Sequence, residues 1–240
     1  MSERVEFCGH FSFAAARERL DAGPDLPLLS PHQVTRDFEE TLCEYTGARY
    51  AVTTNSCTMA ITLAAAWWTR TWRGGPRGLD GRPVLVMPKL SYVGVPAALF
   101  NAGCYPDFRD EDWQGEYGIC WTRAQPVIWD SARRFTSGMY RPGAMQCVSF
   151  HASKILGDSQ GGAILHDSPE ADAWLRRARF DGRTEGADPK TDQVTFPSWH
   201  CYMSPDVAAR LLWKLSALPK HNPDLPRSDY PDLSTLEAFK

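Results

Sequence analysis

The sequence contains no apolar run approaching the roughly 20 residues that a helix needs to cross a lipid bilayer. Its seven cysteines are scattered, odd in number and form no CxxC pair. This pattern argues against a disulfide framework and against a structural zinc site. Residues 1–13 carry charge among their first positions and lack the apolar centre of a secretory signal. We therefore expect a cytoplasmic protein with reduced thiols, no metal site and no membrane partner.

The sequence also lacks an excess of charge of either sign. Lysine and arginine number 26 and aspartate and glutamate 29, so the formal net charge is −3 at pH 7. At the level of the whole chain, this balance gives no electrostatic indication of a nucleic-acid partner. With 43% hydrophobic and 23% charged residues over 240 positions, the composition is that of a globular protein able to bury a full core.

The distribution of proline divides the chain into three expected segments. Prolines interrupt the end of residues 1–33, which we interpret as an N-terminal arm without clean periodicity. Residues 34–218 hold the regular patterns and are expected to form one large domain. Residues 219–240 are again rich in proline, at positions 219, 223, 226 and 231, and are expected to form an extended C-terminal tail.

Within residues 34–218, helical and strand patterns alternate. Apolar residues at helical spacing predict helices at about 34–46, 59–72, 93–101, 169–180 and 205–218. Short apolar runs predict strands at about 50–54, 84–87, 104–108, 127–129, 145–150 and 162–165, the last two as a hairpin. This alternation predicts an α/β fold, a mostly parallel sheet flanked by helices. In such sheets ligands bind at the carboxyl ends of the strands.

A polar turn follows the strand predicted at 50–54. Ser56, Cys57 and Thr58 stand there, directly before the helix predicted at 59–72. A helix N-terminus presents free backbone amides and the positive end of the helix dipole. Ser or Thr before a helix is by itself more often a simple cap. Combined with the acid and the lysine described next, this turn predicts a phosphate site.

Two further strands deliver an acid and a lysine. Asp130 ends the strand at 127–129, and the strand at 145–150 runs into Ser149-Phe150-His151-Ala152-Ser153-Lys154. A lysine amine can form an imine with an aldehyde, and a carboxylate can keep a pyridinium nitrogen protonated. Together with a phosphate turn, these are the requirements of pyridoxal 5′-phosphate. The sequence therefore predicts that cofactor, with Lys154 and Asp130 as catalytic residues.

Taken in order, these motifs resemble the DegT/StrS family, the fold-type-I, pyridoxal-phosphate-dependent aminotransferases that act on keto-sugars attached to nucleotides. The resemblance extends over about residues 31–218. Its most specific part is the segment 149–154, in which the resemblance implies that Ser149 binds the phosphate and Lys154 forms the internal aldimine, a Schiff base. It further implies that the polar turn holds the phosphate and that Asp130 pairs with the ring nitrogen.

The resemblance implies additional contacts with the cofactor. Tyr92 falls where an aromatic side chain stacks on the pyridoxal ring, although judged alone it is as consistent with a core aromatic. His200 lies in the segment 199–204, which resembles the part of the family that reaches the cofactor phosphate across a dimer interface. A homodimer with a shared active site is therefore expected.

Four positions depart from the family's pattern. Cys57 replaces a glycine, Arg133 stands where a neutral Gln or His contacts the ring oxygen or the substrate, and His200 and Tyr202 replace an asparagine and an arginine. Arg133 is a candidate for binding the cofactor or a substrate carboxylate or phosphate, and is equally consistent with solvated surface charge. The family typically adds a smaller C-terminal domain that closes the site. We therefore expect a short form whose site is open or is closed by a partner.

Three hypotheses about function follow. The first is an aminotransferase that moves an amino group from an amino-acid donor such as glutamate to a small-molecule or nucleotide-linked ketone. The second is a decarboxylase or lyase that uses the same cofactor on an amino acid attached to a large carrier, such as a modified nucleotide. The third is a non-catalytic descendant that acts as an interaction protein. The presence of both Lys154 and Asp130 argues against the third.

Overall fold

The computed structural model describes residues 32–71, 77–78, 81–122 and 125–239. The predicted arm at 1–33 lies outside the described residues except for its last two positions. The helices are α2 (Gln33–Thr46), α3 (Cys57–Thr71), α4 (Gly94–Asn101), α5 (Pro169–Ala178) and α6 (Pro205–Ala217). The strands are β1 (Tyr50–Thr54), β2 (Val84–Pro88), β3 (Tyr105–Arg109), β4 (Tyr117–Thr122), β5 (Gln125–Asp130), β6 (Met145–Ser149) and β7 (Gly162–His166).

The strands form one sheet in the order β1-β7-β6-β5-β4-β2-β3. The β5/β6 and β2/β3 pairs are parallel, and the other neighbouring pairs are antiparallel. When these relations are followed along the sheet, five strands share one direction and only β7 and β4 run against them. The predicted α/β fold with a mostly parallel sheet is confirmed in this sense. The predicted hairpin of β6 and β7 is present, whereas β4 occupies a stretch for which no strand was predicted.

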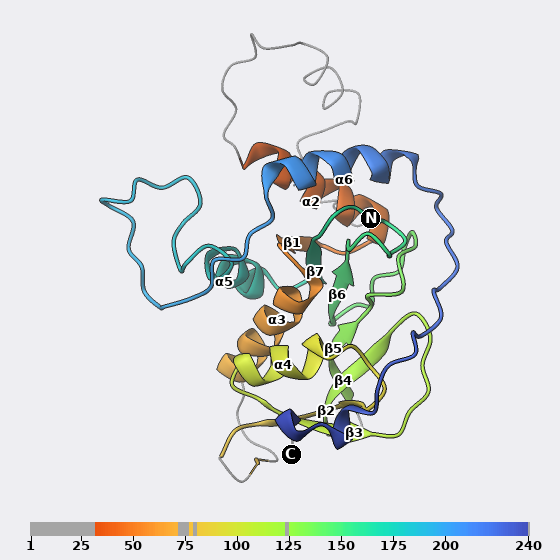
Figure 1. Cartoon of the computed structure of the whole chain (residues 1–240). Helices are drawn as coiled ribbons and strands as arrows, with labels where there is room; N and C mark the ends of the chain where they lie inside the picture. Colours follow the sequence, from red (N-terminus) through yellow and green to blue (C-terminus); the bar gives the residue numbers. More distant parts are fainter. Residues whose placement is uncertain (1–31, 72–76, 79–80, 123–124, 240) are drawn as a thin grey trace, which may run out of the picture.

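Helices cover both faces of the sheet (Figure 1). Helices α3, α4 and α5 bury their apolar side chains in one core with one face of the strands, and α2 and α6 bury theirs in a second core on the other face. Along β7, Ile164 belongs to the first core and its neighbours Ala163 and Leu165 to the second. This alternation follows from the two-residue period of a strand, in which successive side chains point to opposite faces.

Helix α2 illustrates how the sequence sets the length of an element. Phe38 and Leu42 lie one turn apart on its buried face and pack in the second core. The helix ends at Gly47, whose φ of 82° is accessible to glycine at little cost. The amide of Gly47 donates to the carbonyl of Cys43 at 2.9 Å, which satisfies one of the last carbonyls of the helix.

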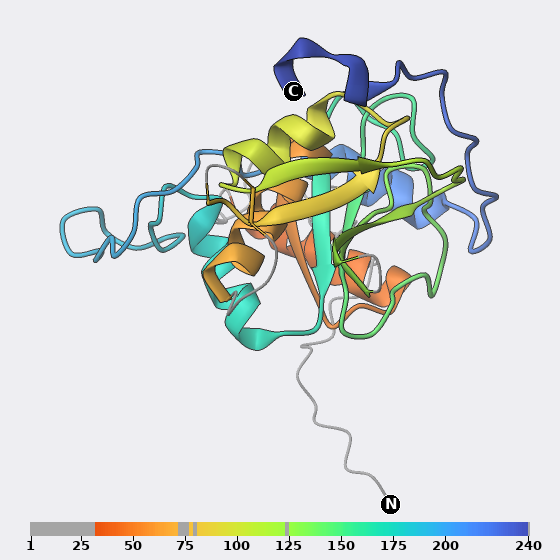
Figure 2. The same ribbon diagram turned by 90° about the horizontal axis from the view of Figure 1, so that it is seen from below.

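After α6, residues 219–239 run along the edge of the domain to the opposite end of the sheet (Figures 1 and 2). They include two short 3₁₀ helices, η2 (Leu233–Thr235) and η3 (Glu237–Phe239). Leu233 is fully buried in the core that contains α3 and α4. Among the described residues, no helix combines the length and the apolar character required to cross a membrane.

Candidate active site

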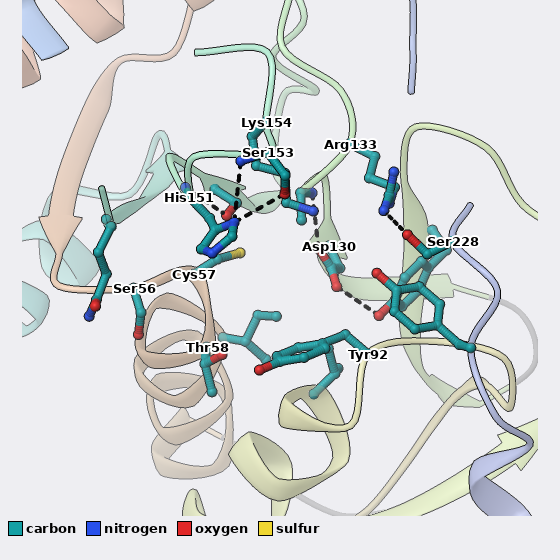
Figure 3. Close-up of a pocket in the computed structure, with 18 of the residues that line it drawn as sticks. Ser56, Cys57, Thr58, Tyr92, Asp130, Arg133, His151, Ser153, Lys154 and Ser228 are labelled. Carbon is teal, nitrogen blue, oxygen red and sulfur yellow. Dashed lines mark hydrogen bonds between the residues drawn. The ribbon is translucent and has the colours of Figure 1, made fainter. Parts of the chain in front are cut away.

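A cavity of about 420 Å³ lies at the carboxyl ends of β1, β5 and β6 (Figure 3). These strands share one direction, so the residues that follow them meet at the same edge of the sheet. The cavity is lined by eight of the nine residues predicted for the site: Ser56, Cys57, Thr58, Tyr92, Asp130, Arg133, Ser149 and Lys154. The ninth, His200, is not among its lining residues.

The polar turn at one end of the cavity is the N-terminus of α3. Ser56 caps the helix, because its Oγ accepts a hydrogen bond from the amide of Met59 at 3.2 Å. The amides of Cys57 and Thr58, the first two residues of the helix, have no partner within it and are available to an anion. Gly162 of β7 passes directly against this turn. A Cβ there would lie 2.5 Å from the nitrogen of Cys57, so only glycine permits this approach.

Asp130 lies at the end of β5 and is only 6% exposed. Its Oδ2 accepts a 2.7 Å hydrogen bond from the hydroxyl of Tyr117, and its Oδ1 accepts one of 3.0 Å from the amide of Ala132. Burial raises the pKa of Asp130 above its usual value, although these two donors and the charge of Lys154 act in the opposite direction. The carboxylate is therefore oriented, shielded from water and in need of a cationic partner.

Lys154 ends a tight turn that follows β6. Its amide donates to the carbonyl of His151 at 2.9 Å, and its half-buried side chain reaches the cavity. The amide of Ser153 donates to Nδ1 of His151 at 3.3 Å, and the hydroxyl of Ser153 lies 3.0 Å from the same nitrogen. Nδ1 of His151 therefore acts as the acceptor for the amide of Ser153 in this turn.

Aromatic side chains form the walls of the cavity. Tyr92, 54% exposed, lies at the mouth, and its ring centroid is 6.5 Å from that of Tyr230. Deeper inside, Trp113 packs on Tyr117 with 4.6 Å between ring centroids and donates through Nε1 to the carbonyl of Leu90 at 3.0 Å. The stacking role predicted for Tyr92 remains a prediction, and its position on the wall is compatible with it.

Arg133 lies at the rim of the cavity, where it contacts the C-terminal segment. Its Nη1 donates to the carbonyl of Pro226 at 2.6 Å, and its Nη2 donates to the hydroxyl of Ser228. Its Nε has no partner among the described residues. Ser228 and Tyr230 join the lining of the cavity from this segment. The C-terminal segment therefore contributes to the site through these two residues, which the sequence patterns did not predict.

His200 lies apart from the cavity. Its Nδ1 is 2.7 Å from Oδ2 of Asp181, and its side chain is 66% exposed. The neighbouring Cys201 does reach the site region, because its carbonyl accepts a 2.7 Å hydrogen bond from the amide of Asn55 next to the polar turn. Contact of His200 with a cofactor therefore requires a second copy of the chain, and that role remains a prediction.

Sequence reasoning missed several lining residues. Tyr117 begins the unpredicted strand β4, and Trp113 lies just before it. Ser228 and Tyr230 lie in the proline-rich segment. A sequence signal was present for Tyr117, because Tyr, Ile, Trp and Thr in the stretch 117–122 are residue types enriched in strands. No cluster of three or more side chains suited to a metal ion is present in the described part of the chain.

Comparison with known proteins shows which proteins this chain is similar to. Residues 28–128 match the model of the DegT/DnrJ/EryC1/StrS aminotransferase family. The resemblance predicted from the motifs is thereby confirmed over this span. The match ends two residues before Asp130, so the roles assigned to Asp130, Ser149 and Lys154 depend on their motifs and on the geometry described above. No curated protein matches the chain.

Several solved structures share the fold. Helicobacter pylori PseC, an aminotransferase of pseudoaminic acid biosynthesis, aligns with 18% identity and a TM-score of 0.64 over 86% of this chain and 62% of its own. DesV of S. venezuelae, solved with a ketimine intermediate, aligns with 20% identity and a TM-score of 0.59 over 85% of this chain and 61% of its own. NtdA of Bacillus subtilis, solved with bound PMP, aligns with 19% identity and a TM-score of 0.59 over 77% of this chain and 48% of its own.

These similarities confirm the predicted fold class, the large domain of fold-type-I aminotransferases. The present chain spans less than two thirds of the length of each of these three structures.

Proposed function

We propose that this chain, whose residues 28–128 carry the pattern of the DegT/DnrJ/EryC1/StrS aminotransferases, binds pyridoxal 5′-phosphate and transfers amino groups. The proposed substrates are an amino-acid donor and a small-molecule or nucleotide-linked sugar ketone. One observation carries the proposal: Asp130, Lys154 and the N-terminus of α3 line the same cavity. Each of the three groups is needed by this cofactor, and they come from separate strand ends.

The residues present fit the cofactor. The first amides of α3 and the hydroxyls of Ser56, Thr58 and Ser149 suit a phosphate, and a helix N-terminus needs no cluster of basic side chains to hold one. Glycine at position 162 allows β7 to pack directly against this turn. At the other end, the buried carboxylate of Asp130 suits a protonated ring nitrogen, since a charge-assisted hydrogen bond is about twice as strong as a neutral one.

The chain's own residues define the chemistry. When bound, the cofactor supplies an aldehyde that takes up the amino group and a ring that accepts electrons. Lys154 is the residue that would hold the aldehyde, and its Nζ, when free, would move the proton at the substrate's α-carbon. Asp130 would keep the ring nitrogen protonated, and Tyr117 fixes the orientation of that carboxylate. Burial strengthens the attraction, because the surroundings of Asp130 screen charge less than water does.

The activity is tested by a single turnover of the protein loaded with pyridoxal phosphate. Glutamate and other amino acids are added one at a time, and the visible absorbance and the mass of the released cofactor are followed. An aminotransferase converts the cofactor to pyridoxamine phosphate with at least one donor, and a Lys154→Ala variant does so far more slowly. Release of carbon dioxide from a substrate, without formation of pyridoxamine phosphate by any donor, would instead support the decarboxylase or lyase alternative.

The proposal includes a homodimer in the cytoplasm. The homodimer is supported by the position of His200. This residue is exposed and lies outside the cavity of its own chain, although the family pattern places it near the phosphate. Sedimentation of the purified protein tests the assembly. A dimer whose His200→Ala variant retains its mass and binds the cofactor more weakly supports a shared site. A monomer that binds the cofactor fully contradicts it.

A further inference from the structure

The C-terminal segment 219–239 is attached to the domain at three places. The first follows α6. There the hydroxyl of Tyr45 donates to the carbonyl of Pro219 at 2.6 Å. The side-chain amide of Asn222 donates to the carbonyl of Phe135 at 3.1 Å and to the hydroxyl of Tyr45 at 2.9 Å. These contacts direct the chain from the end of α6 toward the rim of the cavity.

The second attachment is an ion pair reinforced by backbone hydrogen bonds. Arg134 donates from Nε and Nη2 to the carboxylate of Asp224, with the shortest contact at 2.6 Å. The amide of Leu225 donates to the carbonyl of Arg133 at 2.9 Å, and the amide of Gly115 donates to the carbonyl of Leu225 at 3.3 Å. A bidentate arginine–carboxylate pair fixes orientation as well as distance. The segment is therefore held in a defined register at this point.

The third attachment lies beyond the cavity. Leu233 is fully buried, and its amide donates to the carbonyl of Lys89 at 3.0 Å. The ammonium of Lys89 lies 3.4 Å from the carboxylate of Asp232. The chain between the second and third attachments is thus fixed at both ends, as a strap rather than a free tail.

The part between these two attachments lines the cavity. Ser228 and Tyr230 face it, and Asp229 between them is exposed and does not line it. Arg133 holds the strap from the cavity side through Pro226 and Ser228. Tyr230 lies across the mouth from Tyr92. The two phenol rings therefore border the same cavity as Lys154.

We propose that residues 224–233 form a strap that completes the active site, and that Ser228 and Tyr230 contact the substrate and determine which substrates enter. Arg133 is a positioning residue in this arrangement, because its guanidinium orients the strap. The inference rests on the proposed function. It also gives a physical reason for the arginine at position 133, where the family has a neutral residue: its guanidinium donates two hydrogen bonds to the chain's own C-terminal segment.

The fixed position of the strap is tested first, on the protein without cofactor. Trypsin cleaves after Arg227 only when the strap leaves the domain. Asp224→Asn removes the ion pair with Arg134 and is expected to speed cleavage at this bond by about tenfold or more, in line with the loss of a charge-assisted contact. Asp229→Asn, the matched control, leaves the rate unchanged. Equal cleavage rates of the wild type and Asp224→Asn, at equal melting temperatures, would contradict the proposal that the strap is fixed on the domain.

The selective role of Tyr230 is tested with probes of different size on the protein loaded with pyridoxal phosphate. Methoxyamine and O-benzylhydroxylamine each form a C=N bond with the cofactor and displace the amine of Lys154, which the visible absorbance follows. Tyr230→Ala is expected to accelerate the reaction with the bulky probe by about tenfold or more relative to the reaction with the small one. This is the discrimination typical of one pocket contact. Asp229→Asn is expected to keep the wild-type ratio.

The outcomes separate the two proposals. If the protein shows no visible absorbance band with pyridoxal phosphate, the proposed function is contradicted. The trypsin experiment still tests the strap in that case. A protein with a normal band, whose Tyr230→Ala and Ser228→Ala variants keep the wild-type ratio of the two probes, contradicts the selective role while leaving the proposed function intact. If Tyr230→Ala does not fold, Tyr230→Leu, which also removes the aromatic ring, tests the selective role by the same ratio.

Discussion

Tyr117 and Asp130 are register partners on the adjacent antiparallel strands β4 and β5, and the hydroxyl of Tyr117 donates a 2.7 Å hydrogen bond to the carboxylate of Asp130. Both side chains are buried. Burial and the neighbouring carboxylate raise the pKa of Tyr117 well above its usual value, so its hydroxyl remains a donor at all ordinary pH values. The sheet itself therefore orients the acid that we assign to the ring nitrogen.

The variant Tyr117→Phe is expected to slow amino-group transfer while the cofactor still binds. Loss of the donor removes an interaction that lowers the pKa of Asp130, so that pKa rises further and the carboxylate becomes a weaker partner for a cation. Hydrogen bonds to charged groups are worth about 1.5–3 kcal/mol, which corresponds to a loss in rate of roughly ten- to a hundredfold. Single-turnover rates measured against pH should show the acidic limb moved to higher pH. Tyr105→Phe on β3 is the matched control.

Gly162→Ala tests the cradle at the N-terminus of α3. The added Cβ would lie 2.5 Å from the nitrogen and 2.7 Å from Cα of Cys57, so the turn must move. We expect a loss of about 1–3 kcal/mol of stability and a clearly weaker affinity for pyridoxal phosphate, measured by titration of the absorbance. Gly138→Ala, at a position with open space and a φ of +69°, controls for backbone strain alone. Equal cofactor affinity in the two variants would argue against the assigned phosphate turn.

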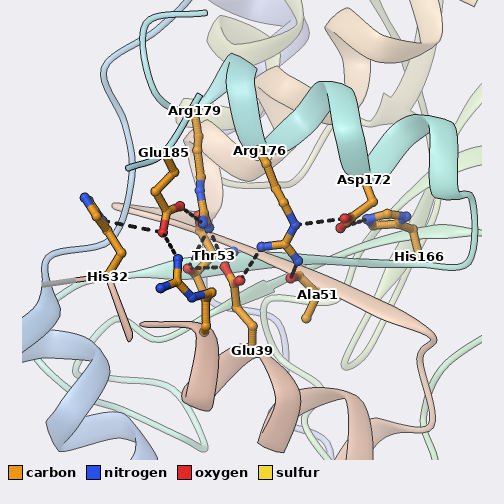
Figure 4. A network of polar contacts seen from close by, with 10 residues as sticks. His32, Glu39, Ala51, Thr53, His166, Asp172, Arg176, Arg179 and Glu185 are labelled. Atoms are coloured by element: carbon orange, nitrogen blue, oxygen red, sulfur yellow. Dashed lines mark hydrogen bonds and ion pairs between the residues drawn. The ribbon is translucent and has the colours of Figure 1, made fainter. Parts of the chain in front are cut away.

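Glu39 is the centre of a buried polar network between α2, β1 and α5 (Figure 4). It is 3% exposed and forms ion pairs with Arg179, which is 1% exposed, and with Arg176 at 2.6 Å. It also accepts from the amide of Thr53 at 2.8 Å. Burial alone would raise the pKa of Glu39, but the two arginines and the amide of Thr53 outweigh it and lower the pKa to about 2.

Glu39→Gln is therefore expected to destabilise the protein by about 3 kcal/mol at neutral pH, because the charge of Arg179 loses a buried partner. The pKa of Glu39 is lower in the folded chain than its usual value of 4.5, so this stabilisation is present above 4.5 and is lost as the pH falls toward about 2. Urea unfolding at a series of pH values measures the difference between wild type and variant. A difference that stays constant through this range would contradict the assignment.

His166 predicts a second pH dependence in a different range. It is 1% exposed, and its ring nitrogens have no hydrogen-bond partner among the described residues; the nearer acid, Asp172, lies 3.7 Å from Nε2. Burial lowers the pKa of His166 from 6.5 to about 4, and the charge of Asp172 only partly opposes it. The unfolded chain therefore binds a proton that the folded chain does not, and stability falls as the pH drops from 6.5 toward 4.

His166→Phe keeps a ring at this position, where His166 stacks on Tyr50 with 5.4 Å between centroids, and removes the titration. Between pH 6.5 and 4, the stability of the wild type is expected to fall relative to this variant by about 1.4 kcal/mol per pH unit. Urea unfolding of both proteins measures the change. Parallel pH profiles of the two proteins would show that His166 is protonated in the folded state or exposed to water.

The sequence patterns were sufficient where local features specify position. Asp130 and Ser149 end apolar runs, and Ser56 caps a helix, so their meeting at one sheet edge followed from the α/β pattern. The sequence patterns were insufficient where the place of a residue in the fold depends on contacts with residues far away in the sequence. Tyr230 stands in a stretch without periodicity, and its place at the cavity depends on the pair between Asp224 and Arg134, which are 90 residues apart.

Two other differences have equally physical reasons. Strand β4 contains Gly118, which weakens a strand pattern, and its short apolar run at 119–121 was not predicted as a strand. His200 was expected near the cofactor because of a family pattern that spans two subunits. A single chain places this residue at the surface beside Asp181.

The most direct test of the account is covalent attachment of the cofactor to Lys154. Pyridoxal phosphate is added to the purified wild type and to Lys154→Ala, the visible spectra are recorded before and after borohydride, and the reduced proteins are digested for mass analysis. The account predicts a visible band that borohydride abolishes, a modified peptide that contains Lys154, and neither in the variant. A wild-type protein without the band, or with modification at other lysines only, would contradict it.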